Sequence, residues 1–246
     1  MGDSFVARRK ALIAALGRVE DHAVPAERYN TDQLVAQMAG ARSVRDLGMV
    51  EVALTKAYLK YARDINSGML VPSRVDNGIV REIQRRDRTE LMHSFAAAED
   101  PKAFLRSLAP QTQEYTRLMK EKLRLQRLIA NGGWGATVPV AKLEPGNSGN
   151  SVIALRDRLM RMGFMQRSAT AQYDRDMEKA VQAFQIAHGL ESDGVAGKGK
   201  ITEINGSAEE RLKSIMVAME RERWLTRESV GREILVNLTE FTAKVM

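Results

Sequence analysis

Histidine, cysteine and serine side chains most often carry proton transfer, nucleophilic attack or metal binding. The 246-residue sequence has no cysteine, which excludes a thiolate nucleophile, a disulfide and a zinc-thiolate site. Its three histidines, His22, His93 and His188, are far apart, and none lies in an H-E-x-x-H spacing. Ser-x-x-Lys, G-x-S-x-G, P-loop and dinucleotide-binding motifs are also absent. We therefore expect no catalytic residue, metal or cofactor in this chain.

The adjacent carboxylates Glu209 and Glu210 could be mistaken for a general acid and base. They stand at the start of an apolar helical pattern, where the positive end of the helix dipole favours acidic side chains. We interpret them as helix-start residues.

The net charge of +7 could indicate a nucleic-acid partner, so the distribution of charge matters. The excess lies in residues 1–145, with 23 Lys and Arg against 17 Asp and Glu. Most of these cations are interleaved with acids, as in Arg85-Arg86-Asp87-Arg88, and no aromatic residues alternate with them. This pattern is typical of solvated helix faces, and we expect no nucleic-acid partner.

The N-terminus has the order of a signal peptide, because Arg8-Arg9-Lys10 precedes an apolar stretch at 11–16. That stretch is short, and Arg18, Glu20 and Asp21 follow it, so we expect an amphipathic helix. No apolar run approaches the roughly 20 residues of a membrane-spanning helix, and we expect no membrane span.

Apolar residues at three- and four-residue spacing predict that residues 1–130 form an all-helical domain. The clearest helix is predicted at 46–65, stopped by Asn66-Ser67-Gly68. One face of this helix carries Leu47, Val50, Leu54, Tyr58, Tyr61 and Ile65.

Glycine and proline between residues 131 and 145 indicate a linker. Residues 146–205 then predict three short helices, near 151–162, 174–188 and 199–205. Residues 206–246 begin with a helix at about 207–223 and end in β-forming residues at 234–238 and 241–245, which have no visible sheet partner. We expect the sequence to stop inside a domain.

The three-helix segment also carries an ordered motif. It reads Gly146-x-x-Gly149-x-x-Val152-x-x-Leu155-Arg156-x-x-Leu159-x-x-x-Gly163-Phe164, then Tyr173-Asp174, then Ala180-Val181-x-x-Phe184-Gln185-x-x-His188-Gly189-Leu190-x-x-Asp193-Gly194-x-x-Gly197.

This motif resembles the peptidoglycan-binding domain of many cell-wall hydrolases and transpeptidases. Arg156 stands where Gln is common in that family, and Lys200 stands where Thr usually opens the third helix. Helical spacing and turn chemistry predict a core of Val152, Leu155, Leu159, Val181 and Phe184, a helix N-cap at Asp174, and turns at Gly163, Gly189 and Gly194. The resemblance implies peptidoglycan as partner, and the matched residues best able to reach a ligand are Arg156, Tyr173, Gln185 and Asp193.

Further segments look like the large murein L,D-transpeptidases that have a helical scaffold domain. They are Tyr58-Leu-Lys-Tyr-Ala-Arg-Asp-Ile-Asn-Ser-Gly68, Gly132-Gly-Trp134, Met219-Glu-Arg-Glu-Arg-Trp224 and Gly231-Arg-Glu-Ile-Leu-Val-Asn-Leu-Thr-Glu-Phe241. The resemblance implies a periplasmic location and a catalytic domain that begins near Ile234. The family's Ser-His-Gly-Cys motif is not in this chain, so its cross-linking activity is not assigned here.

The fold class predicted is mainly α: an N-terminal helical scaffold domain (1–130), a linker (131–145), a three-helix peptidoglycan-binding domain (146–205), and a helix with the first β segment of a missing catalytic domain (206–246). The first hypothesis is that the chain positions peptidoglycan for that catalytic domain. An alternative is a structural adaptor whose helical domain binds an envelope protein, and a third, enzymatic hypothesis requires the gene to continue past Met246. A strand with Ile234, Val236 and Leu238 on one side also predicts self-association through its edge.

Overall fold

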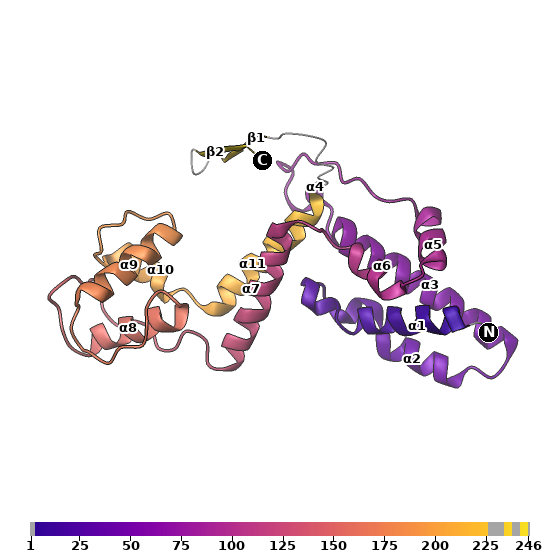
Figure 1. The fold of residues 1–246 in the computed structure, drawn as a ribbon, viewed down its shortest axis with the longest axis horizontal. Helices are drawn as coiled ribbons and strands as arrows, with labels where there is room; N and C mark the ends of the chain where they lie inside the picture. The colour runs from indigo at the N-terminus through magenta and orange to yellow at the C-terminus, as the bar shows by residue number, and fades with distance from the viewer. Residues whose placement is uncertain (1–2, 226–233, 238–241, 246) are drawn as a thin grey trace. The chain divides into compact units, whose positions relative to one another are not determined.

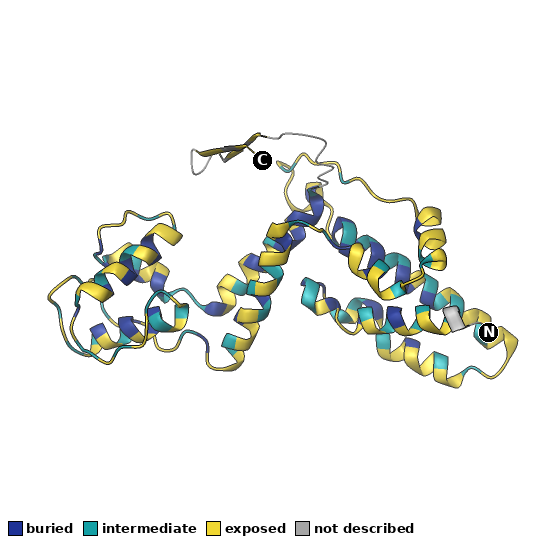
Figure 2. Cartoon of the chain, viewed as in Figure 1, coloured by how far each residue is buried: buried dark blue, intermediate teal, exposed yellow. Residues whose placement is uncertain are grey.

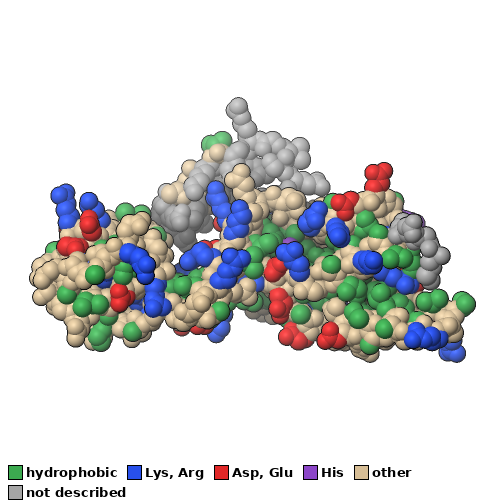
Figure 3. Space-filling model, turned by 60° about the horizontal axis from the view of Figure 1, so that its bottom comes forward, with side chains coloured by type: hydrophobic (Ala, Val, Ile, Leu, Met, Phe, Trp, Pro, Cys, Tyr) green, Lys and Arg blue, Asp and Glu red, His purple; other side chains and the backbone are tan. Residues whose placement is uncertain are grey.

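The computed structural model describes residues 3–225, 234–237 and 242–245. The described chain is mainly helical, which confirms the predicted fold class (Figure 1). It divides into two compact units, one of residues 1–123 and 214–228 and the other of residues 124–213 and 229–246. On the face drawn in Figure 3, Lys and Arg side chains lie among Asp and Glu side chains in both units.

The first unit is built on α1 to α6 and parts of α7 and α11. Their bounds are α1 (Asp3–Leu16), α2 (Thr31–Gly40), α3 (Val44–Ser67), α4 (Pro72–Val75), α5 (Arg88–Ala97), α6 (Pro101–Ser107), α7 (Gln113–Ala130) and α11 (Ala208–Trp224). Two 3-10 turns, η1 (Val19–His22) and η2 (Ala26–Tyr29), join α1 to α2.

Helix α3 is the central helix of this unit. It begins in a capping box, in which the Ser43 hydroxyl accepts from the backbone N–H of Asp46 and the Asp46 carboxylate accepts from the N–H of Ser43. Its predicted apolar stripe faces inward, with Val50, Leu54, Tyr58, Tyr61 and Ile65 buried (Figure 2). Gly68 ends the helix at φ +85°, a conformation that favours glycine.

The last turns of α11 pack into the same unit through buried polar groups. Glu220 accepts hydrogen bonds at Oε1 from the backbone N–H of Leu70, at 2.8 Å, and from the indole N–H of Trp224, at 3.2 Å. Arg223 donates to Glu220 Oε2 at 2.7 Å, to the Tyr115 hydroxyl at 3.1 Å, and to the carbonyl of His22. These bonds tie α11 to three segments that are distant in sequence.

The second unit contains α8 (Asn150–Met162), α9 (Arg175–Ala187) and α10 (Lys198–Asn205), near the three predicted helices. These three helices form the module predicted at residues 146–205. Its five predicted core residues are all buried, and Asp174 caps α9 by accepting from the N–H of Met177, as predicted. The turns at Gly163, Gly189 and Gly194 have positive φ, also as predicted.

The segment expected to be a linker takes part in this core. Val138 and Leu143 are buried with the module's apolar residues. Leu143 exchanges two backbone hydrogen bonds with Ala196, at 3.0 and 2.9 Å. Ala196 follows the turn at Gly194 and belongs to the three-helix module. Its β-like pairing with Leu143 therefore attaches the end of the expected linker to the module.

The C-terminal β segment is paired within the chain. Strand β1 (Ile234–Asn237) lies antiparallel to β2 (Thr242–Val245), with Ile234 opposite Val245. The sequence had suggested strands without partners. The two segments are instead close enough along the chain to form a hairpin with each other. Leu238, the third residue of the predicted apolar face, lies outside the described residues.

Candidate functional site

Arg156, the first predicted ligand contact, is a buried cation of α8 that holds the connection to α9. Its side chain is 1% exposed. The guanidinium donates to the Ser168 hydroxyl at 3.1 Å, to the Gln172 carbonyl at 2.6 Å and to Asp174 Oδ2 at 3.0 Å. The backbone N–H of Met177, with a further contribution from Arg156, lowers the pKa of Asp174. The geometry gives Arg156 a structural role.

Gln185 and Tyr173 both hold the turn around Gly194. Gln185 is fully buried; its amide donates to Asp193 Oδ1 at 2.9 Å and accepts from the Gly194 N–H at 3.0 Å. The buried Tyr173 hydroxyl donates to the Gly194 carbonyl at 2.8 Å. A fixed turn of this kind presents Asp193 at a defined place on the surface.

Asp193 is the one exposed residue of the four candidates. Its carboxylate pairs with Lys200, which stands where the family usually has Thr. The ammonium group of Lys200 is the main cause that lowers the pKa of Asp193 to about 2. The four candidates thus form no single surface: Tyr173, Gln185 and Asp193 meet at one turn, and Arg156 lies in a different network. Their contact with a ligand stays a prediction.

A groove on α8 is the second place in this unit where a ligand could bind. Its volume is about 370 Å³. It is lined by Trp134, Gly135, Ala136, Asn150, Ile153, Ala154, Asp157 and Arg161. These residues come from the start of the segment expected to be a linker and from one face of α8.

Arg158 fixes the wall of this groove that carries Trp134. Its buried guanidinium donates to the carbonyls of Gly135, at 3.0 Å, and Gly206, at 2.7 Å, and it lies 5.9 Å from the centre of the Trp134 ring. Arg161 closes the other side, with Nε 3.3 Å from where a Cβ on Gly135 would be. The indole is therefore held in place before any ligand arrives.

The groove combines a planar aromatic ring, small neighbours and a polar rim. The small residues Ala136 and Ala154 line the groove with the half-buried indole, and the exposed Asp157 and Arg161 can form hydrogen bonds. Aromatic faces with a few convergent polar groups suit ligands that have both apolar faces and hydroxyls, as sugars do. Sequence reasoning placed Trp134 in a linker. A tryptophan among glycines directly before the module was the available signal.

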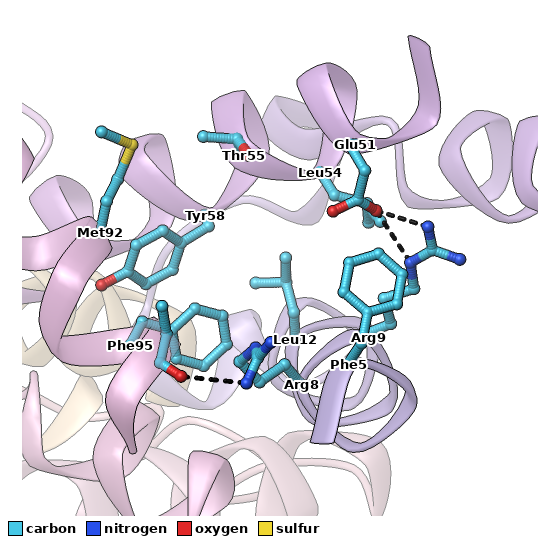
Figure 4. A pocket seen from close by; sticks show the side chains of 11 residues that line it. Phe5, Arg8, Arg9, Leu12, Glu51, Leu54, Thr55, Tyr58, Met92 and Phe95 are labelled. Carbon is cyan, nitrogen blue, oxygen red and sulfur yellow. Dashed lines mark hydrogen bonds and ion pairs between the residues drawn. The ribbon is translucent and has the colours of Figure 1, made fainter. Parts of the chain in front are cut away.

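The first unit contains a separate, aromatic-lined cavity of about 270 Å³ between α1, α3 and α5 (Figure 4). The Tyr58 and Phe95 rings stack there at 4.5 Å. Arg8 donates to the Ala96 carbonyl at 3.0 Å, and Arg9 pairs with Glu51. Both arginines that line this cavity are therefore already engaged by the protein.

Two of the three histidines contact aromatic side chains. His22 Nδ1 lies 3.0 Å from the Tyr115 hydroxyl, and His188 stacks on Phe184 at the end of α9. Among the described residues, no group of three His, Asp or Glu side chains could hold a metal ion. Within the same residues, no helix has both the length and the apolar character needed to cross a membrane.

The architecture is that of a mainly helical protein that contains a small three-helix module. Residues 2–121 match the family model of the Scaffold domain, and residues 148–200 match that of a putative peptidoglycan binding domain. The chain thus carries a scaffold domain followed by a peptidoglycan-binding domain. Both matched ranges fall inside the predicted ranges 1–130 and 146–205. No curated protein matches the chain.

Proposed function

We propose that this chain is the non-catalytic part of a cell-wall L,D-transpeptidase, in which the module holds peptidoglycan for cross-linking by a further domain. The match of residues 148–200 to a peptidoglycan-binding domain carries the proposal. The scaffold domain ahead of it, and the resemblance of Met219–Trp224 to the same enzymes, support the choice of parent protein. Such a protein acts outside the cytoplasm, and we propose the periplasm.

Within the module, we propose that the groove beside Trp134 receives the sugar rings of the wall. The assignment is supported by the face of the indole ring, the small residues beside it and the polar side chains at the rim of the groove. Asp157 and Arg161 would accept from and donate to sugar hydroxyls and amides.

Co-sedimentation with purified peptidoglycan sacculi tests wall binding by the chain and the role of the groove. The full chain is expected to sediment with sacculi at moderate salt, and Trp134→Ala and Asp157→Asn are expected to weaken binding by about tenfold. Ile186→Ala is the matched control, because Ile186 is an exposed apolar residue on α9 outside the groove.

Three results would count against the proposal. Absence of binding by the unaltered chain refutes wall binding. Equal binding by all variants refutes the groove but leaves wall binding by the chain in place. Binding that moderate salt abolishes indicates a general charge effect of the basic helices.

The alternative function, an adaptor for an envelope protein, has one supporting observation. The cavity in Figure 4 has a mainly apolar and aromatic wall that could receive an aromatic side chain of a partner. A chain that ignores sacculi but captures one envelope protein, and loses it on Phe95→Ala, would favour this function.

A further inference from the structure

A strongly cationic groove on the first unit is lined by other residues than the cavity in Figure 4. Its volume is about 280 Å³, and it runs between α3 and the segment that leads into α5. Its lining contains six Lys and Arg residues and no Asp or Glu: Lys56, Lys60, Arg63, Arg85, Arg86 and Arg88. Such a concentration of one charge around a hollow attracts anions.

Five of these cations have no acidic partner in the protein. Among the described residues, no carboxylate forms an ion pair with Lys56, Lys60, Arg85, Arg86 or Arg88, although Lys60 donates to the Arg28 carbonyl. Arg63, in contrast, pairs with the buried Asp64 at 2.6 Å.

Among the described residues, the acid interleaved with the arginines, Asp87, forms no ion pair with them. Asp87 Oδ1 accepts from the backbone N–H groups of Thr89 and Glu90, at 2.8 and 2.9 Å, and so caps α5. From the sequence, the run Arg85-Arg86-Asp87-Arg88 was interpreted as a solvated face. In the structure these four residues are exposed, the carboxylate lies at the start of α5, and the three arginines line the groove.

The floor of the groove narrows the choice of anion. Leu59, Ala62 and Leu91 line it beside the cations, and no aromatic residue is present for base stacking. Guanidinium groups bind carboxylates in a two-pronged geometry. A ligand with carboxylates on short aliphatic arms fits both features, whereas a nucleic acid lacks its stacking platform.

We propose that this groove binds the carboxylate-bearing stem peptides of peptidoglycan, so that the scaffold domain contacts the wall independently of the module. This inference rests on the proposed wall-binding function. The stem peptides of peptidoglycan are short and contain alanine and dicarboxylic residues. The alanine methyl groups can pack on the apolar floor of the groove, and the carboxylates can pair with its arginines.

Titration with a soluble stem peptide tests the groove directly. The probe is the free tetrapeptide L-alanyl-γ-D-glutamyl-diaminopimelyl-D-alanine, added to the full chain and followed by calorimetry at low salt. The combined variant Arg85→Gln, Arg86→Gln and Arg88→Gln is expected to weaken binding by at least about tenfold. The control variant Arg45→Gln, Arg117→Gln and Lys120→Gln removes the same charge from exposed positions outside the groove and should change affinity by less than about twofold.

Comparison ligands decide between the possible anions. Amidation of the peptide carboxylates should abolish binding. Equal binding of the amidated peptide, equal loss in the control variant, or no binding by the unaltered chain overturns the proposal. Tighter binding of a short oligonucleotide or of phosphatidylglycerol vesicles also overturns it, in favour of a phosphate site. Because this titration does not use the groove beside Trp134, failure here is distinguishable from failure of sacculus binding by the module.

Discussion

Arg156 and Asp174 form an ion pair that joins the first two helices of the three-helix module, α8 and α9. Nη2 of Arg156 lies 3.0 Å from Asp174 Oδ2, and the same carboxylate group caps α9 through its other oxygen. The arginine is 1% exposed, so its charge is stabilised by these partners and not by water. The pair therefore links the packing of α8 to the start of α9.

Replacement of Arg156 by alanine should loosen the module without affecting the first unit. The change removes the hydrogen bonds to Ser168, Gln172 and Asp174 and leaves a cavity, and we expect it to lower the local free energy of unfolding by about 2–4 kcal/mol. Hydrogen exchange with mass spectrometry should show faster exchange in α8 and α9. Arg175→Ala, at an exposed position at the start of α9, should leave exchange unchanged. Equal exchange in the two variants would contradict the structural role of Arg156.

Replacement of Gly194 by alanine should destabilise the module, whereas the same change at nearby Gly197 should not. Gly194 has φ +72°, and a Cβ there would lie 2.8 Å from Glu178 Cγ. Gly194→Ala should lower the free energy of unfolding of the module by at least about 1–2 kcal/mol, the cost of a left-handed conformation. Gly197 has φ −73° and nothing within 4 Å of its added Cβ, so Gly197→Ala should be close to neutral. Thermal denaturation of the two variants makes the comparison, and similar losses would refute the conformational argument.

The helices and core of the module could be predicted because their signals are local. Val152, Leu155 and Leu159 recur at helical spacing, and Gly163 and Gly189 mark helix ends. Those features need no knowledge of distant contacts, and the structure agrees with them.

The functions of polar residues could not be predicted in the same way. Burial of Gln185 depends on the turn at Gly194, and burial of Arg156 depends on Ser168 and Gln172. Trp134 lines a groove in a segment that Arg158 on α8 holds through the carbonyls of Gly135 and Ala136. These partners are set by tertiary structure, so sequence spacing gives no sign of them.

His22 should make the first unit less stable in mild acid. Burial, followed by the positive charge of Arg223, lowers the pKa of His22 from 6.5 to about 4. The unfolded chain therefore takes up a proton below about pH 6.5 that the folded chain refuses, and stability falls as pH decreases towards 4. Between about pH 7 and about pH 4.5 the loss should be on the order of 2 kcal/mol, and His22→Gln should lack this part of it.

Two measurements check this prediction. Denaturation can be followed by Trp224, which is buried in the first unit, in a Trp134→Phe background. Titration of the His22 ring by NMR gives its pKa directly. A pKa of His22 near 6.5 would contradict the burial of its ring and the predicted loss of stability in acid.

Arg223 should be the most sensitive contact between α11 and the rest of the first unit. It is buried beside Glu220, and its loss leaves that carboxylate without its cation, which we expect to lower the free energy of unfolding by about 3 kcal/mol. Arg221→Ala, on the exposed side of the same turn, should change it by less than about 0.5 kcal/mol. Hydrogen exchange in residues 214–224 reports the difference.

Arg223→Lys separates charge from geometry at this contact. Lysine keeps the positive charge near Glu220, but it lacks the planar fork that lets Arg223 donate to Glu220, the Tyr115 hydroxyl and the His22 carbonyl together. We therefore expect Arg223→Lys to recover only part of the stability lost in Arg223→Ala. Full recovery would mean that charge alone holds α11 in place. No recovery would mean that the bonds to Tyr115 and His22 account for the stabilisation.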